Sequence, residues 1–434
     1  MGIILFKTVV AVTVTCLAFP ALRLAAPNRS DESFITCAVA LQMFVALTLY
    51  FGIYVIGRQE VPSDVPAFYL PVARQALAGY VPFRDFPLSY GPLFPYVGAA
   101  LVRLWDSGKS FALFAIVMNA VALVAWHRAA LHATDSQTAR RASILYATNG
   151  HLAYQSLLGT NQVWISAGLA VSSWLLFRDR ELRGGLVQAA TAATTKFLAL
   201  LFWPVLWMCA PVRLRWLAGA SVLFAVYAAF ALAGGDILYP FRHEGELTTS
   251  GNLPYLLAPL LAAAGITGPQ LLNGVALGIL LLANLWLFAR VSQLPPRTRP
   301  ELVFAGLALI GALFMLVSKK SYTGYAVFFM YPASLMLLSG TRGPRRSLCF
   351  LLVFNTLLVM EPTLWFRFGG NGRALGEWLP GLGPLPATAF LASDVVLIGC
   401  YVFLVVLSVG YVRDQAARRV ATGGKPAPHS CRAT

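Results

Sequence analysis

The sequence predicts an all-α polytopic membrane protein, because of its composition and because apolar runs recur along its whole length. Of the 434 residues, 58% are hydrophobic and 12% are charged, whereas an ordinary soluble domain has about 25% charged residues. The mean hydropathy is +0.69. A water-soluble fold of this size could not bury so much apolar surface, so the surplus must face lipid. Soluble globular, disordered, collagen-like and coiled-coil classes are thereby excluded.

A helix that crosses a bilayer needs about 20 mostly apolar residues, and several runs reach that length. The clearest predicted spans are 35–57, 109–127, 216–233, 270–289, 301–318 and 388–411. Shorter apolar runs predict further spans at 3–22, 143–158, 163–177, 184–195, 197–210, 323–339 and 347–360. The span-length criterion therefore predicts a bundle of about 11–13 transmembrane helices. The first span is expected to stay uncleaved, because Lys7 lies within its apolar run rather than before it.

The net charge of +16 is explained by topology, because Arg and Lys accumulate in cytoplasmic connections. If the tail is cytoplasmic, alternation of the spans places every short basic connection on the same side: 23–29, 127–141, 178–183, 211–215, 290–299 and 342–346. We therefore expect a multi-pass membrane protein whose basic connections face the cytoplasm. Residues 1–411 would form one transmembrane domain, and 412–434 a disordered cytoplasmic tail. The charge then requires no nucleic-acid partner.

The cysteines do not indicate a disulfide framework or a metal site. The six of them are scattered, with no CxxC pair and no histidine at metal-ligand spacing. Such a distribution is not that of a zinc site or of a small secreted domain. We accordingly expect neither a metal nor a cofactor.

Three connections on the predicted outer side are too long to be turns. They cover about 58–108, 234–254 and 361–387, whereas helix–helix connections usually have about 2–8 residues. We expect short amphipathic helices in them, lying on the membrane surface. Long loops on one side of a polytopic protein predict that its activity lies at that face.

The first of these loops contains two carboxylates. Asp64 follows Ser63 and precedes Pro66 and an apolar periodic stretch, so it is either the N-cap of a surface helix or a catalytic base just outside the membrane. Asp85 follows in a Pro- and aromatic-rich segment with Arg84 beside it, which favours a surface loop.

Lys196 interrupts the run GGLVQAATAATTKFLALLFWPVLW between the basic connections 178–183 and 211–215. Because both connections are predicted on the cytoplasmic side, the run must form a hairpin with Lys196 near its outer turn. An intramembrane cation costs about 2.5–3.5 kcal/mol on insertion scales. Lys196 is therefore expected either to bind an anion or to reach outer headgroups.

Lys319 and Lys320 occupy a very short connection on the same side. Adjacent like charges in a tight turn repel one another, unless an anion such as a phosphate lies between them. Lipid headgroups are the alternative partner. The FRHEGE segment of the second long loop adds His243 and Glu244 as candidate sugar ligands, although a histidine in a polar loop is more often merely solvated.

The order of these motifs resembles that of the membrane-embedded glycosyltransferases of the C-type (GT-C) fold. The resemblance is carried by an Asp soon after a span, then GYVPFRDF and SYGPLFPYV. The segment GTNQVWISAGLAVSSWLLFRDRELRGGLVQAATAATTKFLALLFWPVLWM is similar to the pattern of bacterial glycosyltransferase family 87. The resemblance covers roughly residues 45–335. It departs at SKKSYTGY, because family 87 members often carry aromatic and histidine residues near the outer end of a late span. The donor or acceptor can therefore differ from that of the mannose-specific members.

This resemblance implies an inverting transferase that moves a sugar, with mannose one candidate, from a polyprenyl phosphate donor to a lipid-linked or other glycan acceptor. Asp64 would be the general base, and Lys196, Lys319 and Lys320 would hold the donor phosphate. Substrate-binding candidates are Asp85, Tyr90, His243, Glu244 and Tyr322. A transporter or flippase of lipid-linked sugars, or an enzyme of the O-antigen polymerase or ligase type, remains an alternative.

Overall fold

The computed structural model describes residues 2–27, 30–62, 64–265, 268–292, 294, 300–339 and 343–421. Within these ranges all regular elements are helices, and the only extended pairing is an isolated bridge between Pro82 and Phe86. Eight helices in the same ranges are long and apolar enough to cross a membrane. The predicted all-α polytopic membrane fold is therefore confirmed.

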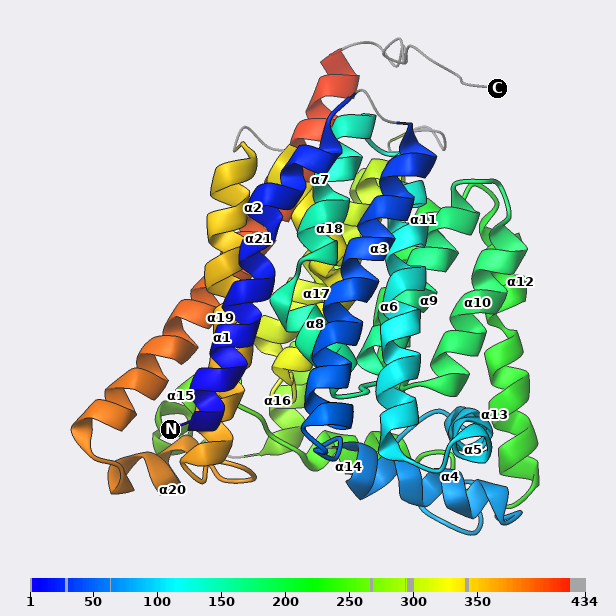
Figure 1. Cartoon of the computed structure of the whole chain (residues 1–434). Helices are drawn as coiled ribbons and strands as arrows, with labels where there is room; N and C mark the ends of the chain where they lie inside the picture. The colour runs from blue at the N-terminus through cyan, green and yellow to red at the C-terminus, as the bar shows by residue number, and fades with distance from the viewer. Residues whose placement is uncertain are drawn as a thin grey trace.

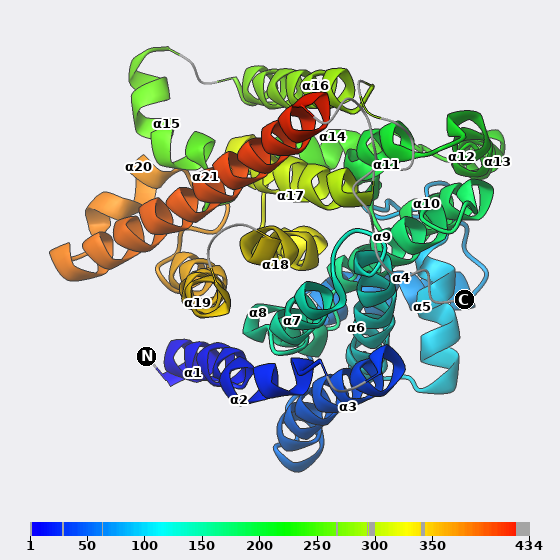
Figure 2. The same ribbon diagram turned by 90° about the horizontal axis from the view of Figure 1, so that it is seen from above.

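The long spans surround a buried centre. They are α1 (Gly2–Cys16) continued by α2 (Ala18–Ala21), α3 (Asp31–Tyr50), α6 (Gly108–Ala130), α12 (Arg213–Ala220) continued by α13 (Val222–Leu232), α16 (Pro269–Ser292), α17 (Pro300–Val317), α19 (Pro344–Arg367) and α21 (Pro384–Ala421). Seen from above, α17 lies inside the bundle beside α18 (Figure 2). Its span is 78% buried, whereas that of α16 at the periphery is 17% buried. The core therefore lies between α17 and the interrupted helices around it.

The shorter predicted spans are helices that are short or broken. They are α7 (Ser136–Ala147) and α8 (Gly150–Leu157), α9 (Gln162–Leu176), α10 (Glu181–Thr194), η4 (Phe197–Phe202) and α11 (Trp203–Cys209), η6 (Thr323–Phe329) and α18 (Met330–Ser339). Asn149 caps α8, since its side chain accepts a hydrogen bond from the Leu152 N–H (2.8 Å). Lys196 lies between α10 and η4, as the predicted hairpin requires.

The three long connections all lie at one end of the bundle, which we call the loop end (Figure 1). They contain η3 (Val65–Tyr69), α4 (Leu70–Leu77), α5 (Phe94–Leu104), α14 (Tyr239–Glu246), α15 (Leu253–Ala263) and α20 (Leu375–Trp378). The C-terminal end of α21 lies at the opposite end (Figure 1). The segment after Asp64 is helical as expected, but begins as the π-helix η3 and ends at Gly79 with φ +90°.

Two helix boundaries differ from the predicted spans. Glu361 was expected to begin a loop, yet α19 continues through Pro362 to Arg367; transmembrane helices tolerate proline because neighbouring groups satisfy the freed carbonyls. Helix α21 extends to Ala421, past the predicted end at 411. Residues 422–434 lie outside the described residues, so the expected disorder of the tail stays a prediction.

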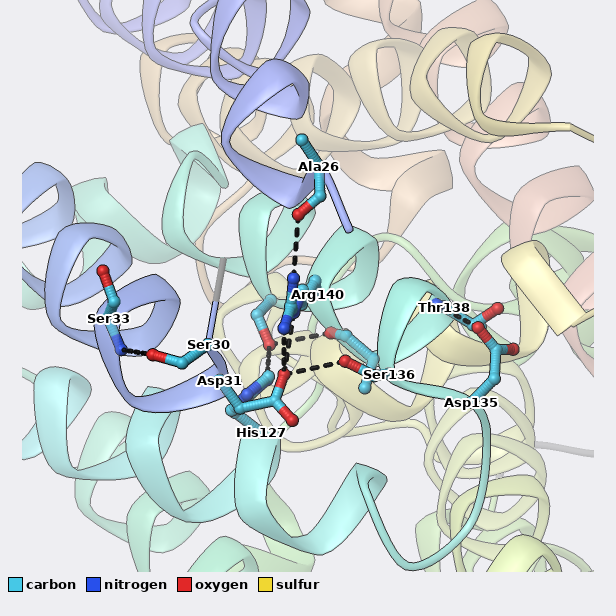
Figure 3. A network of polar contacts seen from close by, with 11 residues as sticks. Ala26, Ser30, Asp31, Ser33, His127, Asp135, Ser136, Thr138 and Arg140 are labelled. Atoms are coloured by element: carbon cyan, nitrogen blue, oxygen red, sulfur yellow. Dashed lines mark hydrogen bonds and ion pairs between the residues drawn. The ribbon is translucent and has the colours of Figure 1, made fainter. Parts of the chain in front are cut away.

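A polar network joins the helix starts at the end opposite the loops (Figure 3). The Arg140 guanidinium donates to the Asp31 carboxylate (2.7 Å) and to the Ala26 carbonyl (2.8 Å). The Ser136 hydroxyl donates to the same carboxylate (2.7 Å). Because Arg140 is 5% exposed, the network ties α7 to the start of α3 from within the bundle.

Cysteine accessibility tests the expected orientation. In a chain whose natural cysteines are replaced by alanine, Glu377→Cys at the loop end should react with a membrane-impermeant thiol reagent added to intact cells. Arg183→Cys, in the first turn of α10 and in the predicted basic connection 178–183, should react only after permeabilisation. Both native side chains are exposed, so accessibility within the fold does not limit either reaction. Labelling of position 183 but not 377 in intact cells would reverse the orientation.

Candidate functional site at the loop end

The loop end contains a buried cluster of two lysines and one glutamate. The Lys196 Nζ lies 3.9 Å from Oε1 of Glu244, and the Lys320 Nζ contacts Oε2 of the same carboxylate. Lys196 is 5% exposed, Glu244 8% and Lys320 9%. A single carboxylate therefore contacts two buried ammonium groups, and an anion that approached both could pair with the second one.

Tyrosine rings surround the two ammonium groups. The Lys196 Nζ lies 4.9 Å from the ring centroid of Tyr90 and 5.8 Å from that of Tyr325. The Lys320 Nζ lies 5.7 Å from the ring centroid of Tyr322. Ring faces stabilise a cation without neutralising it. The tyrosines thus help to keep the lysines buried and still charged.

The first loop fixes the position of Lys196. Backbone N–H groups of Gly91 and Leu93 donate to the carbonyls of Thr195 and Ala193, both at 2.8 Å. These bonds satisfy carbonyls at the end of α10, which would otherwise lack a partner where the helix breaks. A Cβ atom at Gly91 would lie 2.3 Å from the carbonyl oxygen of Ala193, so only glycine permits this approach.

The second loop fixes the position of Lys320. The Thr249 N–H donates to the Lys319 carbonyl, and the Ser321 N–H donates to the Thr249 hydroxyl, both at 2.9 Å. Burial lowers the pKa of Lys320, the Lys196 ammonium lowers it further, and the Asp64 carboxylate raises it. An anion bound between the lysines would favour the charged form of both.

Asp64 lies at the edge of this cluster. It is half-buried at the start of η3, and its side chain makes no capping hydrogen bond. Ser63 lies outside the described residues. The Asp64 carboxylate is within electrostatic reach of Lys320 and of four tyrosines, namely Tyr69, Tyr90, Tyr322 and Tyr325. The carboxylate is therefore available to a ligand rather than used by the helix end.

Six of the nine predicted site residues thus come together: Asp64, Tyr90, Lys196, Glu244, Lys320 and Tyr322. The other three, Lys319, Asp85 and His243, do not join them. Lys319 is 1% exposed, and its Nζ has neither a hydrogen-bond partner nor an ion pair with Glu244. Burial lowers the pKa of Lys319, and the Glu246 carboxylate raises it. Asp85 forms an ion pair with Arg84 at 2.9 Å. His243 stacks on Tyr239 with ring centroids 5.5 Å apart.

Sequence analysis missed two tyrosines of the site. The Tyr69 hydroxyl accepts a hydrogen bond from the Asn161 N–H (3.2 Å), and its ring packs edge-on against Tyr90 at 5.3 Å. Tyr325 is 1% exposed, and its hydroxyl has no partner. The only sequence signal was the spacing in SYTGY, which places Tyr325 three residues after Tyr322, on one side of a 3₁₀-helix.

An apolar groove reaches the same turn from the side of the bundle. Its volume is about 250 Å³, and it lies among α5, α6, α9 and α10. Its lining residues are almost all apolar: Val97, Phe114, Met118, Val121, Trp164, Ala167, Gly168, Val171, Val187, Ala190, Thr191, Thr194 and Thr195. Thr195 in this lining directly precedes the buried Lys196 in the chain.

Comparison of the chain with protein-family models, with curated proteins and with solved structures finds no match. In the part of the chain that the structure describes, no three His, Cys, Asp or Glu side chains come together to hold a metal ion. The expected absence of a metal stays a prediction. The function is therefore inferred from the chemistry of the cluster and the groove.

A substitution that adds a single methyl group tests the contact of Gly91 with α10. Gly91→Ala must separate the first loop from the end of α10, because the added Cβ meets backbone oxygens that cannot rotate away. We expect the free energy of unfolding to fall by about 1–3 kcal/mol, seen as a lower midpoint of thermal unfolding in detergent. Gly278→Ala in α16, where a Cβ meets nothing within 4 Å, is the control. Equal midpoints for the two variants would contradict the assigned contact.

Proposed function

We propose that the chain is an inverting glycosyltransferase of the bacterial inner membrane, with its active site at the loop end facing outward. The donor would be a sugar on a polyprenyl phosphate, mannose being one candidate, and the acceptor a lipid-linked or other glycan. One observation carries the proposal: two buried lysines share a single carboxylate beside a half-buried Asp64. The resemblance to the C-type fold and to family 87 is consistent with this arrangement.

The apolar groove supports a lipid-linked donor. A polyprenyl chain is an unbranched run of isoprene units that needs an apolar surface, whereas its phosphate needs cations. The groove offers apolar walls, and its lining includes Thr195, which directly precedes Lys196 in the chain. A donor whose chain lay in the groove would place its phosphate near Lys196 and Lys320. A free nucleotide sugar would gain nothing from such a surface.

Glu244 occupies the space that the phosphate would take. Its two oxygens face the two ammonium groups, as two phosphate oxygens would. Helix α14 carries Glu244 and is held by few polar contacts, one being the bond from the Asn273 side chain to the Gly245 carbonyl (3.0 Å). Binding would exchange a carboxylate for a phosphate of equal or greater charge, so the lysines would not be left unpaired.

In the proposed reaction Asp64 accepts the proton of the acceptor hydroxyl as that oxygen attacks the anomeric carbon. The bond from the anomeric carbon to the phosphate oxygen breaks, and its electron pair goes to the phosphate. Lys196 and Lys320 neutralise the charge that develops there. Attack from the face opposite the phosphate inverts the configuration, and a phosphate leaving group needs no separate general acid. Tyr90 and Tyr322 offer ring faces to the sugar.

A transporter of lipid-linked sugars is the second candidate, because two helices carry buried carboxylates within their spans, Glu361 and Asp394. Intramembrane carboxylates are common in transporters. Assays of the protein reconstituted in lipid vesicles distinguish the two functions. Transfer of radiolabelled sugar from a polyprenyl monophosphate to a glycan supports the enzyme, and movement of the intact donor across the bilayer without transfer supports the transporter.

Removal of the Asp64 charge tests the general base. Asp64→Asn should lower kcat by a factor of about 10²–10⁴, measured as sugar transfer in vesicles. Loss of a helix cap would have little effect, since Asn caps as well as Asp. Asp106→Asn, which removes an exposed carboxylate paired with Arg74 at the same face, should keep normal transfer. Near-normal activity of Asp64→Asn would remove Asp64 from the mechanism.

Removal of one ammonium group tests the phosphate site. Lys320→Met keeps the length and apolar stem of the side chain, and should raise the donor KM about ten- to hundredfold, the value of a charge-assisted hydrogen bond. Lys109→Met, at an exposed ion pair with Glu60 (3.7 Å) near the loop end, should leave KM unchanged. An unchanged KM for Lys320→Met, at equal protein in the membrane, would show that the lysine serves insertion instead.

A further inference from the structure

Two carboxylates lie buried inside the membrane region, away from the lysine cluster. Glu361 in α19 is 1% exposed and Asp394 in α21 is 0% exposed. None of their four oxygen atoms has a hydrogen bond of good geometry, although the Ser250 hydroxyl approaches Glu361 and the Gly251 N–H approaches Asp394. Among the described residues neither carboxylate forms an ion pair with a Lys, Arg or His. Charged groups without partners in an apolar interior are strongly unfavourable. Either protons or a bound cation must therefore neutralise them.

The helix geometry brings the two carboxylates together. Helices α19 and α21 follow one another through the loop end, so they run in opposite directions (Figure 1). Their rings Phe354 and Tyr401 meet edge to face at 5.6 Å. Glu361 is seven residues after Phe354, and Asp394 seven residues before Tyr401. Seven residues are two helical turns, so each carboxylate lies on the same face as its ring, nearer the loop end.

Tyr401 is a further unsatisfied buried group near this pair. It is 0% exposed, and its hydroxyl has no partner. Side chains in a helix lean towards its N-terminus, which for α21 is the direction of Asp394. The Tyr401 hydroxyl is within electrostatic reach of both carboxylates. Tyr255, also nearby, is unavailable, because its oxygen already accepts from the indole N–H groups of Trp365 and Trp378.

The turn at residues 249–252 lies beside the two carboxylates. Gly251 has φ +79°, and a Cβ atom there would lie 3.4 Å from Oε2 of Glu361. The Ser250 hydroxyl approaches Glu361 from this turn. Oxygen atoms from three elements of the chain thus converge: two carboxylates and the hydroxyls of Tyr401 and Ser250. Carboxylate and hydroxyl oxygens are ligands of hard cations, and nitrogen or sulfur ligands are absent from this set of described residues.

We propose that Glu361 and Asp394, with the hydroxyls of Tyr401 and Ser250, form a binding site for one divalent hard cation of the calcium class. A divalent ion balances the two carboxylate charges. Calcium accepts flexible, all-protein oxygen coordination, whereas magnesium retains several waters, so a set of protein oxygens favours calcium. The same turn bonds the loop of Lys319 and Lys320 through Thr249, so the ion would stabilise the loop end. The inference does not depend on sugar transfer.

Thermal unfolding of the full chain in detergent tests the site. Protein stripped with a chelator should gain about 5 °C in its unfolding midpoint at a calcium concentration 100-fold above Kd, and less with magnesium. Glu361→Gln with Asp394→Asn should lose this gain, while Asp414→Asn, an exposed carboxylate on the same helix, should keep it. No gain for the native chain, with stability that responds to pH alone, would mean that protons neutralise the pair and would overturn the proposal.

A second variant keeps the test decisive if the double variant does not fold. Tyr401→Phe removes one hydroxyl and keeps the ring against Phe354. It should fold normally and bind calcium at least about threefold more weakly, the effect of losing one neutral ligand of about 0.7 kcal/mol. Terbium luminescence, excited through the neighbouring aromatic rings, measures the affinity directly. Unchanged affinity in Tyr401→Phe, or an equal calcium response in the folded double variant, would place any bound ion elsewhere.

Discussion

The candidate site depends on one backbone contact, the pairing of the first loop with the broken end of α10. In a membrane every backbone polar group must find a partner within the protein, so a helix cannot stop at Thr195 unless something satisfies the carbonyls it leaves open. The N–H groups of Gly91 and Leu93 do so. This contact lets the chain present Lys196 at a turn, and it brings Tyr90 against the ammonium group.

The same principle explains why interrupted helices surround the centre of the bundle. The pattern of helical backbone hydrogen bonds is broken at three places: between α7 and α8, between α10 and η4, and between α17 and η6. Side chains or loops there bond the backbone N–H and C=O groups that the helices leave open. The continuous span α16 lies at the periphery, where lipid offers no alternative partner. Polar groups can therefore gather only where protein surrounds them, which is where both buried charge clusters lie.

Much of this arrangement could be predicted from the sequence. Basic connections on both sides of the Lys196 run required a hairpin, and loop length directed attention to Asp64 and Glu244. The separation of Lys319 from Lys320 could not be predicted, because successive residues in an extended loop point to opposite sides and only the packing decides which side faces the site. The pairing of Glu361 with Asp394 was also hidden, because the predicted span ended at residue 360, and a single carboxylate inside an apolar run does not reveal its neighbour.

Chain order gives the contact of Gly91 a consequence for biogenesis. Lys196 enters the membrane during synthesis before Glu244 and Lys320 have been made, so its later ion-pair partner does not yet exist. The loop that carries Tyr90 and Gly91 has by then already emerged. It can hold the newly inserted lysine through the ring face and the two backbone bonds until the second loop is translated. The first loop would thus stabilise Lys196 during insertion, until its ion-pair partner is in place.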